Sequence, residues 1–117
     1  CGACHGERNA LGAARGAGGG LLPGSHWYAP ALDSAAEAGV ADWSAQEVVD
    51  LLKTGQSARG SALGPMAEVV YRSTQHLRDA DLRAMAAYLR ALPPVPLPAP
   101  VQHERDAAQL ARGATVY

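Results

Sequence analysis

The sequence predicts an all-α fold, because apolar residues recur at helical spacing and no segment alternates as a strand would. Within residues 1–92, helical signals occupy three parts: residues 44–54, a segment that begins at Gly64-Pro65, and residues 79–92. With 117 residues, the chain has room for one domain and at most an appendage. We therefore expect one small helical domain.

The first helix has clear signals at both ends. Ser44 and Glu47 have the spacing of a capping box, while Trp43 and Val48 occupy the two positions of a hydrophobic staple. Gly55 follows where a left-handed residue commonly ends a helix. We therefore interpret Trp43 as a packing residue rather than as an electron relay.

The next two helices are marked by proline and by an apolar stripe. Pro65 suits the first position of a helix, which places Met66 in the first turn. In the third helix, Asp79 is the predicted N-cap and the prolines after residue 92 end the helix. Its apolar residues follow spacings of three and four, as Leu82, Met85, Leu89 and Leu92. Met85 is therefore expected in the core.

The other segments are predicted to connect or extend these helices. Residues 12–20 are rich in glycine and predict a loop, without the strand-to-helix context and lysine of a phosphate-binding loop. Residues 93–102 predict a stiff, extended proline-rich linker. Apolar residues recur at helical spacing again in residues 103–117, which predict a further short helix.

The first five residues, CGACH, have the C-x-x-C-H spacing of a covalent haem attachment site. On one helical turn, Cys1 and Cys4 can each form a thioether to a porphyrin vinyl group. The imidazole of His5 then lies under the iron as an axial ligand. The motif predicts haem c as the cofactor.

Zinc and redox sites share part of this pattern. Because Cys1 and Cys4 are the only cysteines, the chain cannot complete a Cys4 or Cys3His zinc site. A Cys2His2 site that uses His26, His76 or His103 stays formally open, although these histidines lack the usual H-x3–5-H spacing. A non-haem zinc or disulfide module is therefore kept as an alternative.

Composition excludes several other classes and favours a bulky cofactor. The net charge is −1 with acids and bases interspersed, which argues against a nucleic-acid partner or an anionic membrane surface. No stretch approaches the ~18 apolar residues of a membrane span. Only 5% of residues are aromatic and none is phenylalanine, so large side chains for a close-packed core are few. A buried porphyrin would supply the missing bulk.

With these features in place, the chain resembles class I c-type cytochromes over about residues 1–92. The resemblance is strongest to one haem domain of the multi-haem cytochrome c subunits of periplasmic alcohol, aldehyde and gluconate dehydrogenases. Besides the haem motif, four segments carry it: residues 42–44, 52–55, 61–70 and 73–76. The stretch Gly64-Pro65-Met66 is the most specific of them.

The resemblance implies a cytochrome c-like helical domain around a covalent haem, with roles for individual residues. Cys1 and Cys4 would form the thioethers, and His5 and Met66 would be the axial ligands of the iron. A methionine thioether raises the reduction potential relative to a second histidine.

Other ligand assignments and one contact with the haem periphery stay open. His76 and His26 are the alternatives to Met66 as the second axial ligand. Arg59, in the loop before Met66, is a candidate partner for a haem propionate, and an exposed loop arginine is an equal interpretation.

At its two ends the chain departs from the family pattern. The helix that should precede Cys1 is missing, whereas Gly113 and Tyr117, four residues apart, give residues 103–117 the pattern of that helix. We expect the chain to extend from one haem motif to just before the next. It would comprise a haem domain (1–92), a linker (93–102) and the helix that leads into a following haem domain (103–117). Alternatively, the last helix folds back onto residues 79–92, as in a circular permutant.

The predicted function is electron transfer rather than catalysis. The resemblance implies a relay from a dehydrogenase subunit, through other haem domains, to a quinone or terminal oxidase of the respiratory chain. It also implies a periplasmic location at the outer face of the bacterial inner membrane, with membrane association only through the parent complex. A five-coordinate haem domain for gas or peroxide sensing or catalysis is the alternative function.

Overall fold

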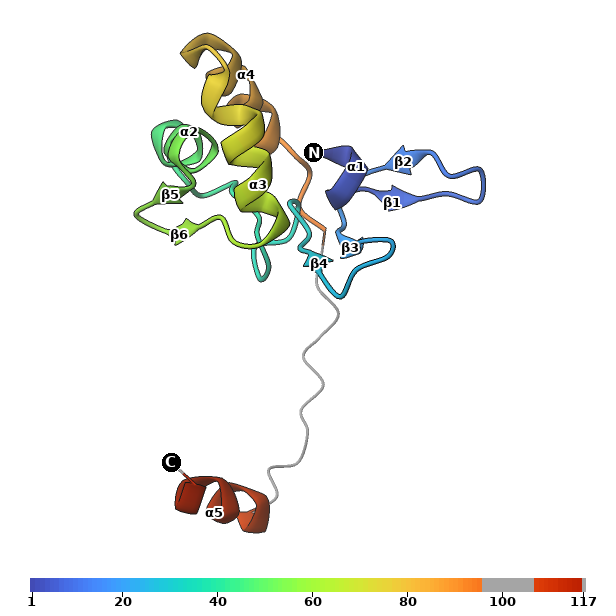
Figure 1. Cartoon of the computed structure of the whole chain (residues 1–117), viewed down its shortest axis with the longest axis vertical. Helices are drawn as coiled ribbons and strands as arrows, with labels where there is room; N and C mark the ends of the chain where they lie inside the picture. The colour runs from blue at the N-terminus through green and yellow to red at the C-terminus, as the bar shows by residue number, and fades with distance from the viewer. Residues whose placement is uncertain (96–106, 117) are drawn as a thin grey trace.

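The computed structural model describes residues 1–95 and 107–116, so most of the predicted linker lies outside the described residues. The helices, shown in Figure 1, are α1 (Gly2–His5), α2 (Ala45–Thr54), α3 (Pro65–Arg72), the 3-10 helix η1 (Thr74–His76), α4 (Asp79–Arg90) and α5 (Ala107–Val116). Two-residue strands form three antiparallel pairs: β1 (Glu7–Arg8) with β2 (Ala14–Arg15), β3 (Gly20–Leu21) with β4 (Tyr28–Ala29), and β5 (Gln56–Ser57) with β6 (Gly60–Ser61). The all-α prediction is confirmed.

Helix α2 has the predicted caps at both ends. The Glu47 backbone N–H donates to Ser44 Oγ at 3.1 Å, and the Ser44 backbone N–H donates to Glu47 Oε2 at 2.7 Å. Gly55 ends the helix in the left-handed region (φ 79°), where its N–H donates to the Leu51 carbonyl. Trp43 packs against the core from the residue before the cap, so its interpretation as a packing residue is confirmed.

Helix α3 begins at Pro65 as predicted, and Met66 lies in its first turn. After α3, the chain passes into η1, which is fastened to α2 by a buried contact. Thr74 is 5% exposed, and its hydroxyl donates to the Leu52 carbonyl at 2.5 Å. The end of α3 is therefore tied to the end of α2.

Helix α4 shows that the predicted N-cap is wrong by one residue. The cap is Arg78, and Asp79 is the first helical residue. The Asp79 carboxylate lies 3.7 Å from Lys53 Nζ on α2, while the Arg78 guanidinium pairs with Asp81 at 2.9 Å. An acid in the first turn is stabilised by the helix dipole. Asp79 therefore supports the helix start by charge, without the side-chain hydrogen bond of a cap.

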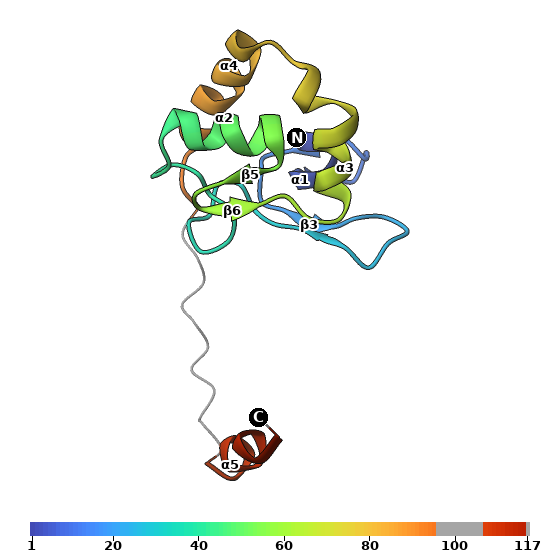
Figure 2. The same ribbon diagram turned by 60° about the vertical axis from the view of Figure 1, so that its left-hand side comes forward.

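The hydrophobic core lies between α2 and α4, which lie side by side in Figures 1 and 2. Leu82 and Val48 are its largest fully buried side chains. The other buried members of the cluster are Val40, Val49, Leu52, Ala86 and Leu89. Met85 and Leu92 pack against this cluster and are partly buried, which confirms the predicted stripe of α4.

The first third of the chain contains no comparable core among its described side chains. Between residues 1 and 39, the buried hydrophobic residues are Ala17, Ala29 and Ala31. The glycine-rich segment predicted as a loop contains β2 and leads into β3. Within it, Gly19 has φ 74°, and a Cβ there would lie 2.6 Å from the Ala29 carbonyl oxygen, so only glycine fits. Backbone hydrogen bonds and the close approach of neighbouring backbone segments hold this part of the chain together.

Helix α5 confirms that the predicted last segment is helical. Its apolar residues include Leu110 and Val116, and none of its described residues is buried. Whether this helix leads into a following haem domain or packs back on α4 stays a prediction. Among the described residues, no helix has the length and apolar character needed to cross a membrane.

Candidate functional site

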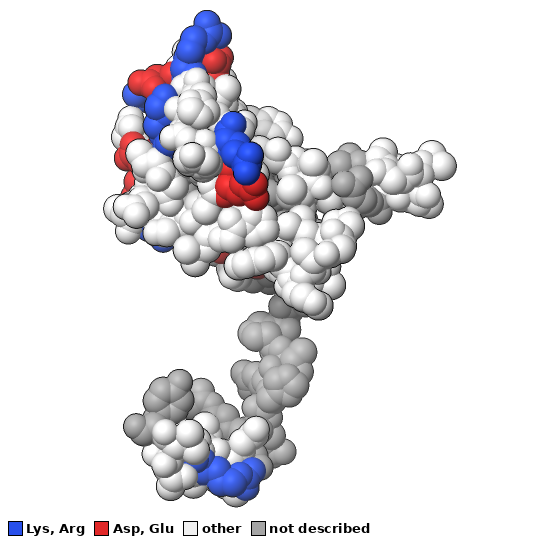
Figure 3. Space-filling model, in the orientation of Figure 1, with Lys and Arg blue, Asp and Glu red and all other residues white. Residues whose placement is uncertain are grey.

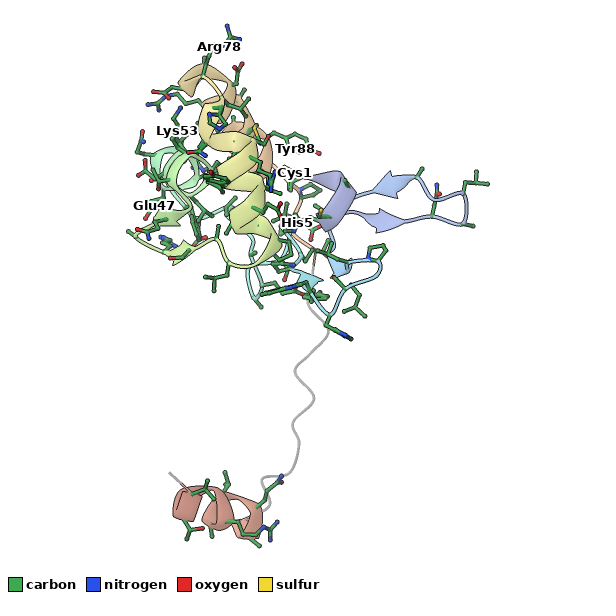
Figure 4. The ribbon with its side chains drawn as sticks, viewed as in Figure 1. Cys1, His5, Glu47, Lys53, Arg78 and Tyr88 are labelled. Carbon is green, nitrogen blue, oxygen red and sulfur yellow. The ribbon has the colours of Figure 1, made fainter. Side chains whose placement is uncertain are left out.

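The haem motif forms a single helical turn at the start of the chain (Figure 4). Cys1 caps α1 with its backbone, because the N–H groups of Cys4 and His5 both donate to the Cys1 carbonyl, at 3.1 and 2.9 Å. Both cysteines are exposed and neither forms a disulfide. The turn therefore presents two accessible thiols next to one imidazole.

The orientation of the His5 imidazole is set by a distant backbone group. Its Nδ1 lies 2.8 Å from the Pro30 carbonyl oxygen, and a carbonyl can only accept, so Nδ1 carries the proton. In this tautomer, Nε2 keeps its lone pair. The His5 carbonyl also accepts from the Gly19 N–H at 2.9 Å, so the residue is held through both its side chain and its backbone.

The segment around Pro30 is fastened in turn by Glu37. The Glu37 Oε2 accepts from the Ala31 backbone N–H at 2.7 Å and from the Tyr28 hydroxyl at 3.0 Å. The hydrogen bond to Glu37 raises the pKa of Tyr28, since it favours the protonated phenol. One carboxylate thus holds the residues on both sides of Pro30.

Met66 lies on the helix that faces the haem motif. Figures 1 and 2 both place α3 beside α1. Met66 is the second residue of α3, and its backbone N–H donates to the Leu63 carbonyl at 3.2 Å. Like Met85 on α4, it is partly buried and packs against the core. The degree of burial therefore does not distinguish the two methionines. They differ in the helix that carries them: Met66 is on α3 and Met85 is on α4.

Arg59 is engaged with protein carboxylates. Its guanidinium lies 2.8 Å from Asp42 Oδ2 and 3.4 Å from Glu47 Oε1, and its Cζ lies 6.0 Å from the centre of the Trp43 ring. The hydrogen bond to Asp42 raises the pKa of Arg59. These contacts join the β5–β6 hairpin to the start of α2, and contact with a propionate stays a prediction.

Neither of the other two described histidines joins the thiols in an alternative metal site. His26 and His76 are exposed, and His103 lies outside the described residues. Across residues 1–95 and 107–116, no three side chains of the metal-binding types form a cluster. The zinc alternative thus finds no ligand set in this part of the chain.

On the face seen in Figure 3, the charged side chains that are described gather over α2, α3, α4 and α5. Several of these charges are paired, as in Glu68 with Arg72 and Arg78 with Asp81. A cavity of about 170 Å³ lies beside the motif; its lining comprises Ala3, Cys4, Gly6, Gly19, Gly20, Leu21 and Pro23. The lining has no charged side chain.

Sequence reasoning did not identify three residues that support this site. Pro30 holds His5, Glu37 holds the segment around Pro30, and Trp27 contacts Gly64 two residues before Met66. Pro30 and Trp27 lie 25 and 37 residues from their partners, in segments without periodicity, so no local pattern pointed to them. The haem motif and the Gly64-Pro65-Met66 stretch, in contrast, carried a signal in the sequence.

Comparison with known proteins gives the family. The cytochrome c family model matches residues 1–93. The chain is 43% identical over 96 residues to the fructose dehydrogenase cytochrome subunit of Gluconobacter japonicus, a match that covers 80% of this chain and 19% of that subunit. It is 42% identical over 106 residues to the cytochrome c subunit of alcohol dehydrogenase (quinone) of Gluconobacter oxydans, with 82% and 22% covered.

A third relative has a different description. The chain is 39% identical over 99 residues to a diheme cytochrome c-type protein of Cereibacter sphaeroides, with 81% of this chain and 32% of that protein covered. The chain spans about a fifth of the length of the two dehydrogenase subunits. The predicted resemblance to dehydrogenase cytochrome subunits is confirmed. This chain therefore belongs to the cytochrome c family, whose members bind haem c covalently.

Proposed function

We propose that this chain is an electron-transfer domain whose haem c is attached to Cys1 and Cys4, with His5 and Met66 as axial ligands. One observation carries the proposal most directly. His5 Nδ1 donates to the Pro30 carbonyl at 2.8 Å, which leaves Nε2 available for a metal. An imidazole held in this way, next to two free thiols, has the donor chemistry that covalent haem requires.

Burial and exposure in the rest of the domain are also consistent with a bound haem. Among the described side chains of the first third, the buried hydrophobic ones are all alanines, whereas Leu21, Trp27 and Leu63 are 75%, 51% and 73% exposed. Large exposed apolar side chains gain stability when an apolar group covers them. A porphyrin would provide both the cover and the bulk that the interior lacks.

The side chains proposed as ligands would tune the bound group. When bound, haem supplies a reversible one-electron couple. The hydrogen bond from His5 to the Pro30 carbonyl makes the imidazole a stronger donor. The Met66 thioether is neutral and soft, so it favours the reduced state and raises the potential. Two protein ligands would also leave no open coordination position, which supports transfer of electrons over catalysis.

The relatives support a partner class for the whole protein. Fructose dehydrogenase and alcohol dehydrogenase (quinone) each have a cytochrome subunit that resembles this chain. We infer that a dehydrogenase subunit delivers electrons to this domain, and that other haem domains, a quinone or a terminal oxidase accept them. The location that accompanies this role is the periplasm, at the outer face of the inner membrane.

Replacing each methionine in the haem-loaded chain tests the ligand assignment. Met66→Ala is expected to abolish the weak sulfur-to-iron charge-transfer band in the far red. Met85→Ala is expected to keep the band and to lower the free energy of unfolding, near the lower end of the ~2–5 kcal/mol typical of core truncations, because Met85 is only partly buried. Absorption spectra and urea denaturation provide the two measurements.

Other outcomes would contradict parts of the proposal. A band that survives Met66→Ala but not Met85→Ala would reassign the ligand. A high-spin ferric spectrum of the unmodified chain would favour the five-coordinate alternative. Extraction with acidified acetone tests Cys1 and Cys4 independently, since thioether-linked haem stays with the polypeptide.

A further inference from the structure

Trp27 is an aromatic side chain that the proposed ligand set leaves without a role. It lies in the hairpin of residues 19–30, just before β4, and is 51% exposed. Its backbone is fixed within the hairpin, because its N–H donates to Ser25 Oγ at 3.2 Å and its carbonyl accepts from Leu22 N–H at 2.9 Å. A large apolar ring is therefore held at a defined place on the surface.

The ring of Trp27 lies directly against the backbone of Gly64. A Cβ built on Gly64 would lie 2.5, 2.6 and 2.7 Å from three atoms of the six-membered ring. Gly64 has φ 54° and ψ −132°, which L side chains rarely adopt, and it is the N-cap of α3. Both the conformation and the ring exclude a side chain at this position, so the close approach is built into the sequence.

The same hairpin is fastened to His5 at both of its ends. At one end, the Gly19 N–H donates to the His5 carbonyl at 2.9 Å; at the other, the Pro30 carbonyl accepts from His5 Nδ1 at 2.8 Å. Trp27 lies between these two anchors in the sequence and reaches Gly64, two residues before Met66. One short hairpin thus contacts the segments of both proposed axial ligands.

We propose that Trp27 is a positioning residue that presses on Gly64 and thereby holds Met66 at the distance from His5 that iron ligation requires. This inference rests on the proposed His5 and Met66 ligation. Its physical basis is that the ring of Trp27 buries apolar surface against the Gly64 backbone, which favours keeping the two segments together. Without the ring, the first turn of α3 is free to move away from the hairpin, and the thioether yields more easily to a competing ligand.

Titration of the haem-loaded full chain with imidazole tests this role, because imidazole competes with the Met66 thioether for the iron. Loss of the far-red band reports the displacement. Trp27→Leu is expected to tighten apparent imidazole binding about three- to ten-fold, because it removes part of the apolar contact that the indole makes. Trp27→Phe keeps an aromatic ring and is expected to tighten binding by about two- to three-fold.

Tyr71→Leu is the matched control, since Tyr71 is an aromatic residue on α3 and is 71% exposed. It is expected to change imidazole binding less than two-fold. Circular dichroism establishes that each variant is folded. Equal imidazole binding in the unmodified chain and both folded Trp27 variants would overturn the positioning role. Absence of the far-red band in the unmodified chain would instead overturn the Met66 ligation, so the two failures are distinguishable.

Discussion

Thr74 offers the sharpest test of how the helices that support the site are held together. It follows α3, and its hydroxyl donates to the Leu52 carbonyl of α2. Leu52 is among the last four residues of α2, so its carbonyl has no partner within the helix. The next candidate donor, the Gln56 N–H, donates to Thr54 Oγ1 instead. Thr74 thus satisfies a carbonyl that would otherwise be unpaired.

Thr74→Val removes this hydrogen bond and leaves the shape of the side chain almost unchanged. Because Thr74 is 5% exposed, water cannot easily replace the lost donor. A buried polar group left unpaired costs about 1–3 kcal/mol. In a domain of this size, each kcal/mol corresponds to about 4–8 °C in the unfolding midpoint. We therefore expect Thr74→Val to lower the midpoint by at least ~4 °C.

Thermal and urea unfolding of the haem-loaded chain, followed by far-ultraviolet circular dichroism, measure the effect. Thr74→Ser is the matched control, because it keeps the hydroxyl and loses one methyl group, worth about 0.8 kcal/mol when buried. It is expected to destabilise less than Thr74→Val. Unfolding of Thr74→Val within about 0.3 kcal/mol of the unmodified chain, or a larger loss in Thr74→Ser, would refute the reasoning.

Two further predictions concern pH. The Ser44 backbone N–H, followed by the Ser44 hydroxyl, holds the pKa of Glu47 below its ordinary value. Its stabilising effect is therefore present above the ordinary carboxyl pKa and lost as the pH falls through the lowered pKa. Glu47→Gln should flatten the acid limb of a plot of stability against pH; an unchanged limb would contradict this. The raised pKa of Tyr28 contributes stability below the ordinary phenol pKa, which is lost as the pH rises through the raised value. Glu37→Gln should return the Tyr28 titration, followed by NMR, toward the ordinary value; an unaltered titration would mean that Glu37 does not hold the hydroxyl.

The helices were predictable because their signals are local. The capping box of α2, the proline that begins α3 and the apolar stripe of α4 all rest on residues within about three turns of each other. Asp79 shows the limit of this reasoning. The sequence contains an acid at the start of α4, but its actual partner, Lys53 at 3.7 Å, lies on another helix. The Asp79 carboxylate thus contacts a neighbouring helix, and the cap is Arg78.

The contacts that support the site could not be predicted, because they too join residues that are far apart in the sequence. The haem motif is contiguous, so its two thiols and its imidazole were found directly. The carbonyl that orients His5 belongs to Pro30, and backbone carbonyls leave no trace in a residue pattern. The contact of Trp27 with Gly64 joins a hairpin to a helix cap across 37 residues, and neither segment is periodic. Such contacts depend on how the two parts of the domain meet.

Different interactions hold the two parts of the domain in place. This difference affects how each proposed ligand of the haem iron is held. The helical part has its own core, centred on Leu82 and Val48, and Met66 at the start of α3 packs against it. The first third is placed instead by hydrogen bonds, glycines and the proposed haem. Packing resists displacement in all directions, whereas hydrogen bonds are directional and fix orientation. It follows that the His5 imidazole is fixed mainly in orientation, through Pro30, while Met66 is fixed mainly in position. Substitutions near Pro30 should then act on donor strength, and substitutions at Trp27 on the retention of the thioether.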